Sequence, residues 1–279
     1  MFKKVLLCTD GSEYSQIAME TAFYLARKFS ADVDALHVIE NKVLDGPLFA
    51  DLSGAFGATP YQDFYSQLKE LYEQRAKTTL DLVEKTAHSV FVKCDTFREQ
   101  GVLAEVVARY EANADLVVLG RNGENARHRS DLIGHSVEDI LRRSSKPCLI
   151  TLNRFHEFKK AVIAFDGSEN SRHALRAGLE LSKNLPLALT LIAVDTGNPE
   201  AASDALAYAV REAQKAGVPV DEQVLTGNAD DEITGYCKKR GVDLIIMGAY
   251  GHTRIREFIL GSTTNSVLIK SPVPVMLVR

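Results

Sequence analysis

Short apolar runs alternate along the chain with longer stretches that mix apolar and polar residues. The first run of each half, residues 5–9 and 162–165, has no apolar–polar alternation, which is typical of a strand buried on both faces. The other runs that we expect to form strands are 34–39, 92–97, 116–120 and 148–151 in the first half, and 189–194, 221–226, 244–248 and 275–278 in the second.

Between these runs the spacing changes to that of amphipathic helices. Ala18, Ala22, Leu25 and Ala26 recur at i, i+4, i+7 and i+8, which places them on one face of a helix. The Asp and Ser side chains just before them can accept hydrogen bonds from the free amides of a helix start. The other helices that we expect are 68–87, 103–113, 202–216, 230–240 and 262–271, with one more after the first glycine loop.

The second half of the chain repeats the first. Residues 5–38 align with residues 161–194 at a constant offset of 156 and without a gap, so that the sequence DGSE occurs twice. ADLVVLGRNG pairs in the same way with VDLIIMGAYG, and SSKPCLIT pairs with SPVPVMLV. A duplicated unit of this size predicts two domains, residues 1–152 and 158–279, joined by a short segment near NRFHEF.

The predicted fold class is α/β, with two tandem doubly wound domains, each a five-stranded parallel sheet with helices on both faces. Ligands of such sheets bind beyond the carboxyl ends of the strands, at the switch point of the strand order. The DGSE turns and the glycine loops both follow strands, so the fold should bring them to one edge. The first half also has an insert, residues 41–67, which is either a lid or contact surface or a packed surface excursion.

Composition narrows the class of protein. The chain has 279 residues, of which 46% are hydrophobic and 25% charged, as in ordinary globular proteins. A net charge of −4 argues against a nucleic-acid binder, which needs a basic face. No apolar run is as long as a membrane span, and the cysteines at 8, 94, 148 and 237 form no metal or redox spacing. We expect a cytoplasmic protein with isolated reduced thiols, no metal site and no catalytic residues.

The glycine loop GAYGHTRIREFILGSTT, residues 248–264, has the features that a phosphate ligand requires. Glycines let main-chain amides approach the ligand, a helix N-terminus offers free amides, and hydroxyls complete the oxygen shell. His252 and Arg254 can balance phosphate charge. A tight structural turn is the alternative, because short glycine motifs occur often by chance. The dinucleotide motif GxGxxG and the P-loop motif are both missing.

The spacing Gly-x2-Gly-x9-Gly-Ser after a hydrophobic strand, together with DGS after the first strand, resembles the universal stress protein family over essentially the whole chain. The resemblance implies an adenine-nucleotide alpha-hydrolase-like fold that binds ATP, ADP or AMP, with or without Mg²⁺, in the second domain. It assigns Ala164, Phe165, Asp166 and Val194 to the adenine and ribose side. The residues that it places beside the ribose and the phosphates are Met247, Gly248, Gly251, His252, Arg254, Gly261, Ser262, Thr263 and Thr264.

The first half departs from this spacing. Ten residues, instead of nine, separate Gly123 from Gly134, and His135 takes the place of the first hydroxyl residue. The loop between them is basic, with Arg121, Arg127, His128 and Arg129. We therefore expect this site to be degenerate, either empty or specific for another anion, and we expect one nucleotide per chain.

The function that we expect is a stress-response regulatory or sensor module that binds an adenine nucleotide. The alternative is a slow ATP-hydrolysing enzyme that uses the same site, with His252 and Asp166. A phosphorylated receiver with Asp10 or Asp166 as acceptor is disfavoured, because the acidic cluster and lysine it requires are not present together. The resemblance also implies that the two domains mimic a dimer of single-domain proteins, with VMLV against CLIT. The chain is then either a monomer or a homodimer.

Overall fold

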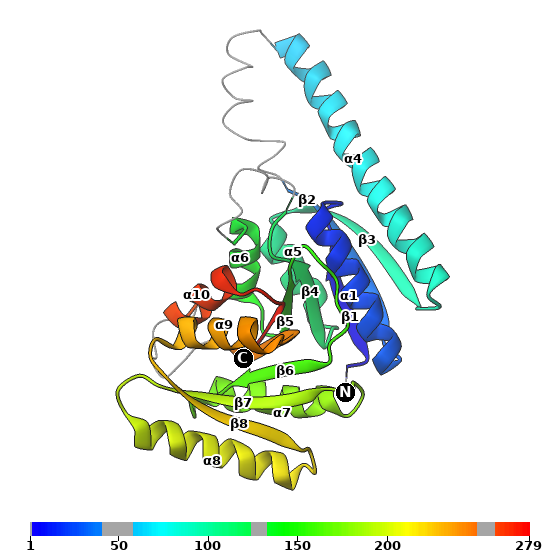
Figure 1. Ribbon diagram of the computed structural model, residues 1–279. Coiled ribbons are helices and arrows are strands. Elements are labelled where there is room, and N and C mark those ends of the chain that lie inside the picture. Colours follow the sequence, from blue (N-terminus) through cyan, green and yellow to red (C-terminus); the bar gives the residue numbers. More distant parts are fainter. Residues whose placement is uncertain (1, 41–57, 124–132, 250–259) are drawn as a thin grey trace.

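The computed structural model describes residues 2–40, 58–123, 133–249 and 260–279, in which strands and helices alternate as the sequence predicts (Figure 1). The strands are β1 (Lys4–Cys8), β2 (Asp32–Glu40), β3 (Cys94–Gly101), β4 (Leu116–Gly120), β5 (Cys148–Thr151), β6 (Lys160–Ala164), β7 (Ala188–Asp195), β8 (Val220–Thr226), β9 (Leu244–Gly248) and β10 (Val275–Val278). The helices are α1 (Glu13–Phe29), α4 (Ala58–Ser89), α5 (Leu103–Glu111), α6 (His135–Arg143), α7 (Glu169–Ser182), α8 (Pro199–Lys215), α9 (Ala229–Arg240) and α10 (Ser262–Lys270).

The ten strands of the described residues all belong to one sheet, in the order β3-β2-β1-β4-β5-β10-β9-β6-β7-β8. Within each half the strands are parallel, and the order reverses beside the first strand, between β1 and β4 and again between β6 and β9. The halves meet where β10 runs antiparallel to β5, with Met276 opposite Leu149. The pairing of VMLV with CLIT within one chain, which the resemblance implied, is therefore present.

Helices cover both faces of the sheet, as predicted. Alternate residues of the buried strands point to opposite faces: Val5 and Leu7 join a core under α1, α4, α7 and α8, whereas Leu6 joins a core under α5, α6, α9 and α10. Because both faces are covered, the central strands carry apolar residues at every position, which explains the lack of alternation in the sequence. The predicted α/β fold class is confirmed.

The duplicated DGSE sequence starts the first helix of each half in the same way. The side chains of Ser12 and Ser168 are the N-caps of α1 and α7, and they accept from the amides of Ser15 and Ser171 at 3.2 and 3.3 Å. Each cap satisfies one of the amides that a helix start leaves free. Identical local sequences thus give identical turns at the carboxyl ends of β1 and β6.

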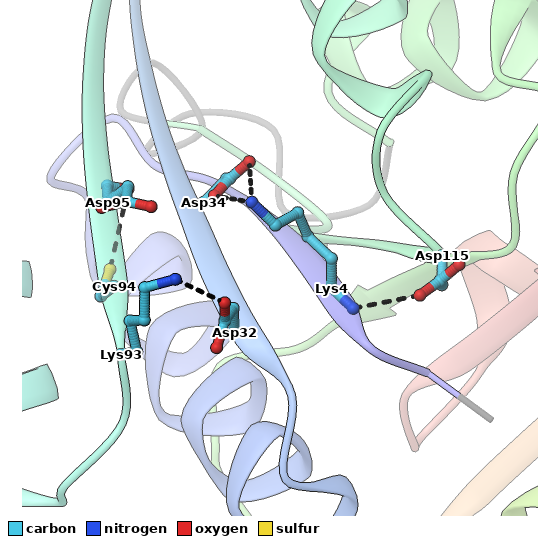
Figure 2. Close-up of polar contacts among 7 residues, drawn as sticks. All are labelled: Lys4, Asp32, Asp34, Lys93, Cys94, Asp95 and Asp115. Carbon is cyan, nitrogen blue, oxygen red and sulfur yellow. Dashed lines mark hydrogen bonds and ion pairs between the residues drawn. The ribbon is translucent and has the colours of Figure 1, made fainter.

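Carboxylates tie the opposite, amino-terminal edge of the sheet together. Asp115, just before β4, accepts from the amide of Lys4 at 3.0 Å, and Asp243 repeats this contact with Lys160 at 2.9 Å in the second half. In the first half the side chain of Lys4 also donates to Asp34 at 2.9 Å (Figure 2). These aspartates are far from the loops of the candidate site, so their role is structural.

Helix α4 begins earlier than the sequence indicated. Residues 58–67, which we assigned to the insert, form its first turns, and the helix continues to Ser89. Figure 1 shows this helix reaching past the end of the sheet. The insert is therefore partly a helical extension, and residues 41–57 lie outside the described part of the chain.

Candidate functional site

The candidate site lies at the switch point of the second half, where β6 and β9 are neighbours. Ala164, at the end of β6, is opposite Met247, and Gly248 is the last residue of β9. The DGSE turn follows β6, and α10 begins after the loop that follows β9. The fold thus brings both motifs to one edge of the sheet, which is where doubly wound sheets bind ligands.

The turn after β6 is held by its own polar groups. Asp166 accepts from the amide of Ser168 at 3.0 Å, and Gly167 has φ +82°, a left-handed conformation that favours glycine. Of the Asp and Ser side chains that the sequence offers as caps, Ser168 is the N-cap of α7, and Asp166 shapes the turn that precedes it. The Asp166 residue is exposed at the strand edge, within reach of solvent and ligands.

Phe165 and Val194, which both lie near this edge, differ in how deeply they are buried. The Phe165 ring is 2% exposed and stacks on Tyr208 at 5.9 Å between centroids, so it belongs to the core under α7 and α8. Its amide bonds to the carbonyl of Ile192 at 2.8 Å. Val194, near the end of β7, is half-buried. The Phe165 side chain therefore belongs to the core and is not exposed at this edge of the sheet.

Gly248 is required by packing. A Cβ at this position would lie 2.9 Å from main-chain atoms of Asn170 and Ser171, closer than real contacts allow. Gly120 has the same role in the first half, where a Cβ would meet the main chain of Tyr14 at 2.9 Å. The first glycine of both loops therefore lets the first helix of each half pack against the neighbouring strand, whatever else it does.

Gly261 has a different environment. It is the N-cap of α10 with φ −58° and ψ 146°, values that any residue adopts. Because glycine has no side chain, no side-chain hydrogen bond caps the helix start. Backbone conformation therefore does not explain why glycine occupies this position.

The hydroxyls of the first turn of α10 face different surroundings. Ser262 is exposed and Thr263 is half-buried. Thr264 is buried, and its Oγ1 donates to the carbonyl of Gly248 at 3.3 Å, which fixes the start of α10 against the end of β9. Gly251, His252 and Arg254 lie outside the described residues.

The first half has the same arrangement with different polar contacts. Gly134 is the N-cap of α6, and its amide bonds to the carbonyl of Arg121 at 3.1 Å. Ser136, in the first turn of α6, donates to the carboxylate of Glu40 at 3.1 Å. The Arg121 side chain points to the other half and donates to the carbonyl of Ile269 at 3.3 Å. Arg127, His128 and Arg129 lie outside the described residues.

Two residues of the first-half site, Glu40 and Asn122, are not indicated by the sequence pattern. Glu40 ends β2, and nothing in its local sequence indicates a partner 96 residues away. Asn122 lies inside the glycine loop, is 3% exposed, and has an Nδ2 with no hydrogen-bond partner among the described residues. The local signal for Asn122 is its place between Arg121 and Gly123 in the sequence RNG.

The described parts of the chain contain neither a reactive thiol nor a metal-ligand cluster. All four cysteines are free, and burial raises the pKa of each thiol, to about 12 for Cys94, Cys148 and Cys237. Protonated thiols are poor nucleophiles. Over the described ranges no three His, Cys, Asp or Glu residues form a metal-ligand cluster, and no described helix is long and apolar enough to cross a membrane.

A cavity of about 320 Å³ lies between α7 and α8. Arg172, Arg176 and Tyr208 are among its lining residues, and the guanidinium of Arg172 lies 4.8 Å from the centroid of the Tyr208 ring. Its lining includes none of the residues predicted for the nucleotide. The candidate site is therefore defined by the strand ends and helix starts, and not by this cavity.

Comparison with known proteins agrees with the duplicated architecture. A model of the universal stress protein family matches the chain twice, at residues 1–151 and 157–279. Universal stress protein Slr1230 of Synechocystis sp. is 31% identical over 287 residues, which cover 99% of this chain and 100% of that protein. Universal stress protein MJ0531 of Methanocaldococcus jannaschii is 28% identical over 152 residues, covering 54% of this chain and 82% of that protein.

The fold is also that of a solved structure. A universal stress protein from Archaeoglobus fulgidus superposes with a TM-score of 0.75 at 22% sequence identity, covering 99% of this chain and 96% of that one. The two family matches together include both DGSE turns and both glycine loops of this chain. The chain therefore belongs to the universal stress protein family.

Proposed function

We propose that the second half of the chain binds ATP, or the related nucleotides ADP or AMP, and acts as a regulatory or sensor module of a stress response. The family membership supports this class of function. The observation that carries the ligand is the start of α10: a glycine N-cap with an ordinary backbone conformation, no side-chain cap, and exposed Ser262 beside it. Free amides and a hydroxyl at a helix N-terminus favour phosphate oxygens.

The proposed contacts follow from the order of the elements along the edge. The adenine and ribose would lie at the end of β6, beside Ala164, the main chain of Phe165 and Asp166. Val194, near the end of the neighbouring strand β7, would lie next to them. Met247 and Gly248 end β9 beside the ribose. The phosphates would contact Gly261, Ser262 and Thr263, while Thr264 holds the helix start in place through the Gly248 carbonyl. We propose the same phosphate role for Gly251, His252 and Arg254 from their sequence spacing alone.

Mg²⁺, if it accompanies the nucleotide, would be carried by the phosphates. Asp166 supplies a carboxylate at this edge, but it does not form a three-residue ligand cluster with other described residues. Magnesium commonly binds proteins through one or two carboxylates plus substrate phosphates. The donor set therefore fits a metal that arrives with ATP better than a resident ion.

Titration calorimetry with ATP and Mg²⁺ tests the proposal. We expect Gly261→Glu to abolish binding, because a carboxylate would replace the phosphate at the start of α10. Ser262→Ala should weaken binding by a few-fold, as expected for the loss of one hydrogen bond to a charged group. If Gly261→Glu remains folded and binds as tightly as the parent protein, the assignment is wrong. Mass spectrometry of small molecules released from the purified protein identifies the nucleotide.

A further inference from the structure

In the first half, a side-chain carboxylate lies at the start of the last helix. Glu40 is the final residue of β2, at the carboxyl edge of the sheet, and its Oε1 accepts from the hydroxyl of Ser136 at 3.1 Å. Its second oxygen, Oε2, is shielded from solvent. Ser136 is the second residue of α6, so the carboxylate lies beside the first turn of that helix.

The second half lacks this carboxylate at the matching position. At the constant offset of 156, Glu40 aligns with Thr196, an exposed residue just beyond β7. Aligning SSKPCLIT with SPVPVMLV places Ser136 over Thr263. The hydroxyl in the first turn of the last helix is therefore present in both halves, whereas the carboxylate that contacts it is present only in the first.

Helix starts attract negative charge; α6 has Glu138 in its first turn, and no side-chain hydrogen bond from the described residues caps its N-terminus. Gly134, its N-cap, has no side chain, and a Cβ on it would find ordinary contacts of 3.5 Å or more. The buried Nδ2 of Asn122, in the loop that packs against Gly134, has no hydrogen-bond partner among the described residues. A carboxylate beside the first turn interacts favourably with the helix dipole, and a second anion placed next to it would be repelled.

We propose that Glu40 is a specificity-determining residue: its carboxylate occupies the anion position at the start of α6 and closes the first half to phosphate. This inference rests on the proposed function, because it explains why one half binds the nucleotide and the other does not. The first glycine loop is one residue longer than the second, and the carboxylate repels the phosphate that the start of α6 would otherwise attract. Glu40→Gln keeps an acceptor oxygen for Ser136 and removes only the charge.

The test uses inorganic pyrophosphate, which needs no adenine pocket, and the amide NMR signals of residues 135–137 and 262–264 as separate reporters of the two halves. We expect pyrophosphate to shift the signals of residues 135–137 in Glu40→Gln with an affinity at least tenfold higher than in the parent chain. A folded Glu40→Gln chain whose signals at 135–137 respond to pyrophosphate no more than those of the parent would overturn the proposal. Failure of the proposed nucleotide site would appear elsewhere, as unresponsive signals at residues 262–264.

A reciprocal variant tests the same idea in the second half. Thr196→Glu should introduce the carboxylate that the first half has, and we expect it to weaken ATP binding at least tenfold. Thr196→Gln is the matched control, because it has the same size without the charge, and it should bind ATP like the parent. Equal ATP affinity of the Glu and Gln variants would contradict a role for the carboxylate at this edge.

Discussion

The guanidinium of Arg279 donates to the main-chain carbonyls of Leu141 and Arg142, at 2.8 and 2.6 Å, at the end of α6 in the other half of the chain. Arg121 makes the reciprocal contact with Ile269 at the end of α10. Each half thus supplies a cation to the last helix of the other, where the helix dipole favours positive charge. The pairing of β5 and β10 joins the two halves into one sheet, and these arginine contacts add further links between the halves.

Loss of the Arg279 contacts should destabilise the chain. Arg279→Ala leaves the two carbonyls of α6 without this partner, and hydrogen bonds to charged groups contribute about 1.5–3 kcal/mol each, so we expect a loss of about 3 kcal/mol or more. Denaturant unfolding measures the change. Arg211→Ala, on the exposed face of α8, is the control and should change stability by less than about 0.5 kcal/mol. Equal stabilities of the two variants would rule out a role for Arg279 in joining the halves.

The first glycine of each loop should resist substitution in both halves. A methyl group at Gly120 or Gly248 would press on the main chain of the neighbouring helix start, and such overpacking costs about 1–3 kcal/mol. Gly235 is the control, since it lies exposed inside α9 with nothing within 4 Å of its Cβ position. Gly235→Ala should stabilise the protein by about 0.5–1 kcal/mol. Thermal unfolding that ranks the three variants differently would contradict the packing role.

Acid should weaken the contact between α9 and α10. Hydrogen bonds from Lys270 at 2.6 Å and Ser266 at 2.5 Å lower the pKa of Asp230 to about 2. A carboxyl whose pKa is lowered by folding stabilises the protein above its unfolded value near 4, and this contribution is lost as the pH falls toward 2.

Because the pair lies at the surface and is screened, we expect the contribution to be about 1 kcal/mol. Unfolding free energies measured between pH 5 and 2 should fall less steeply for Asp230→Asn than for the parent chain. Asp204→Asn, an exposed change on α8, should follow the parent. A parent-like slope for Asp230→Asn would show that this contact contributes nothing.

The sequence predicted the fold well because the information was local and repeated. Continuous apolar runs such as LVVLG indicate buried parallel strands. The DGSE turn forms from contacts between residues three positions apart, as the hydrogen bonds of Ser12 and Ser168 show. The duplication then supplied the order of the elements twice. The predicted start of α4 is ten residues too late. Residues 58–67, ATPYQDFYSQ, mix polar and aromatic side chains, and their sequence has no clear N-cap.

The polar contacts of the site could not be predicted in the same way. The pairs Glu40–Ser136 and Arg121–Ile269 join residues 96 and 148 positions apart, and neither residue of a pair has a local pattern that indicates the other. The role of Gly248 was also ambiguous, because a glycine that admits a ligand and one that admits a neighbouring helix leave the same signature in a sequence. The distance from its Cβ position to Asn170 shows the packing role, which the sequence alone does not reveal.

The central claim is that the duplicated chain binds one nucleotide, in its second half. The stoichiometry of ATP binding, measured by calorimetry with Mg²⁺ on the parent chain and on the matched variants Gly261→Glu and Gly134→Glu, tests it most directly. Both glycines are helix N-caps with similar backbone angles, φ −58° and −56°, so both variants should fold. We predict one ATP per chain in the parent and in Gly134→Glu, and none in Gly261→Glu. Two ATP molecules per chain, or binding that is lost in Gly134→Glu and kept in Gly261→Glu, would contradict the account.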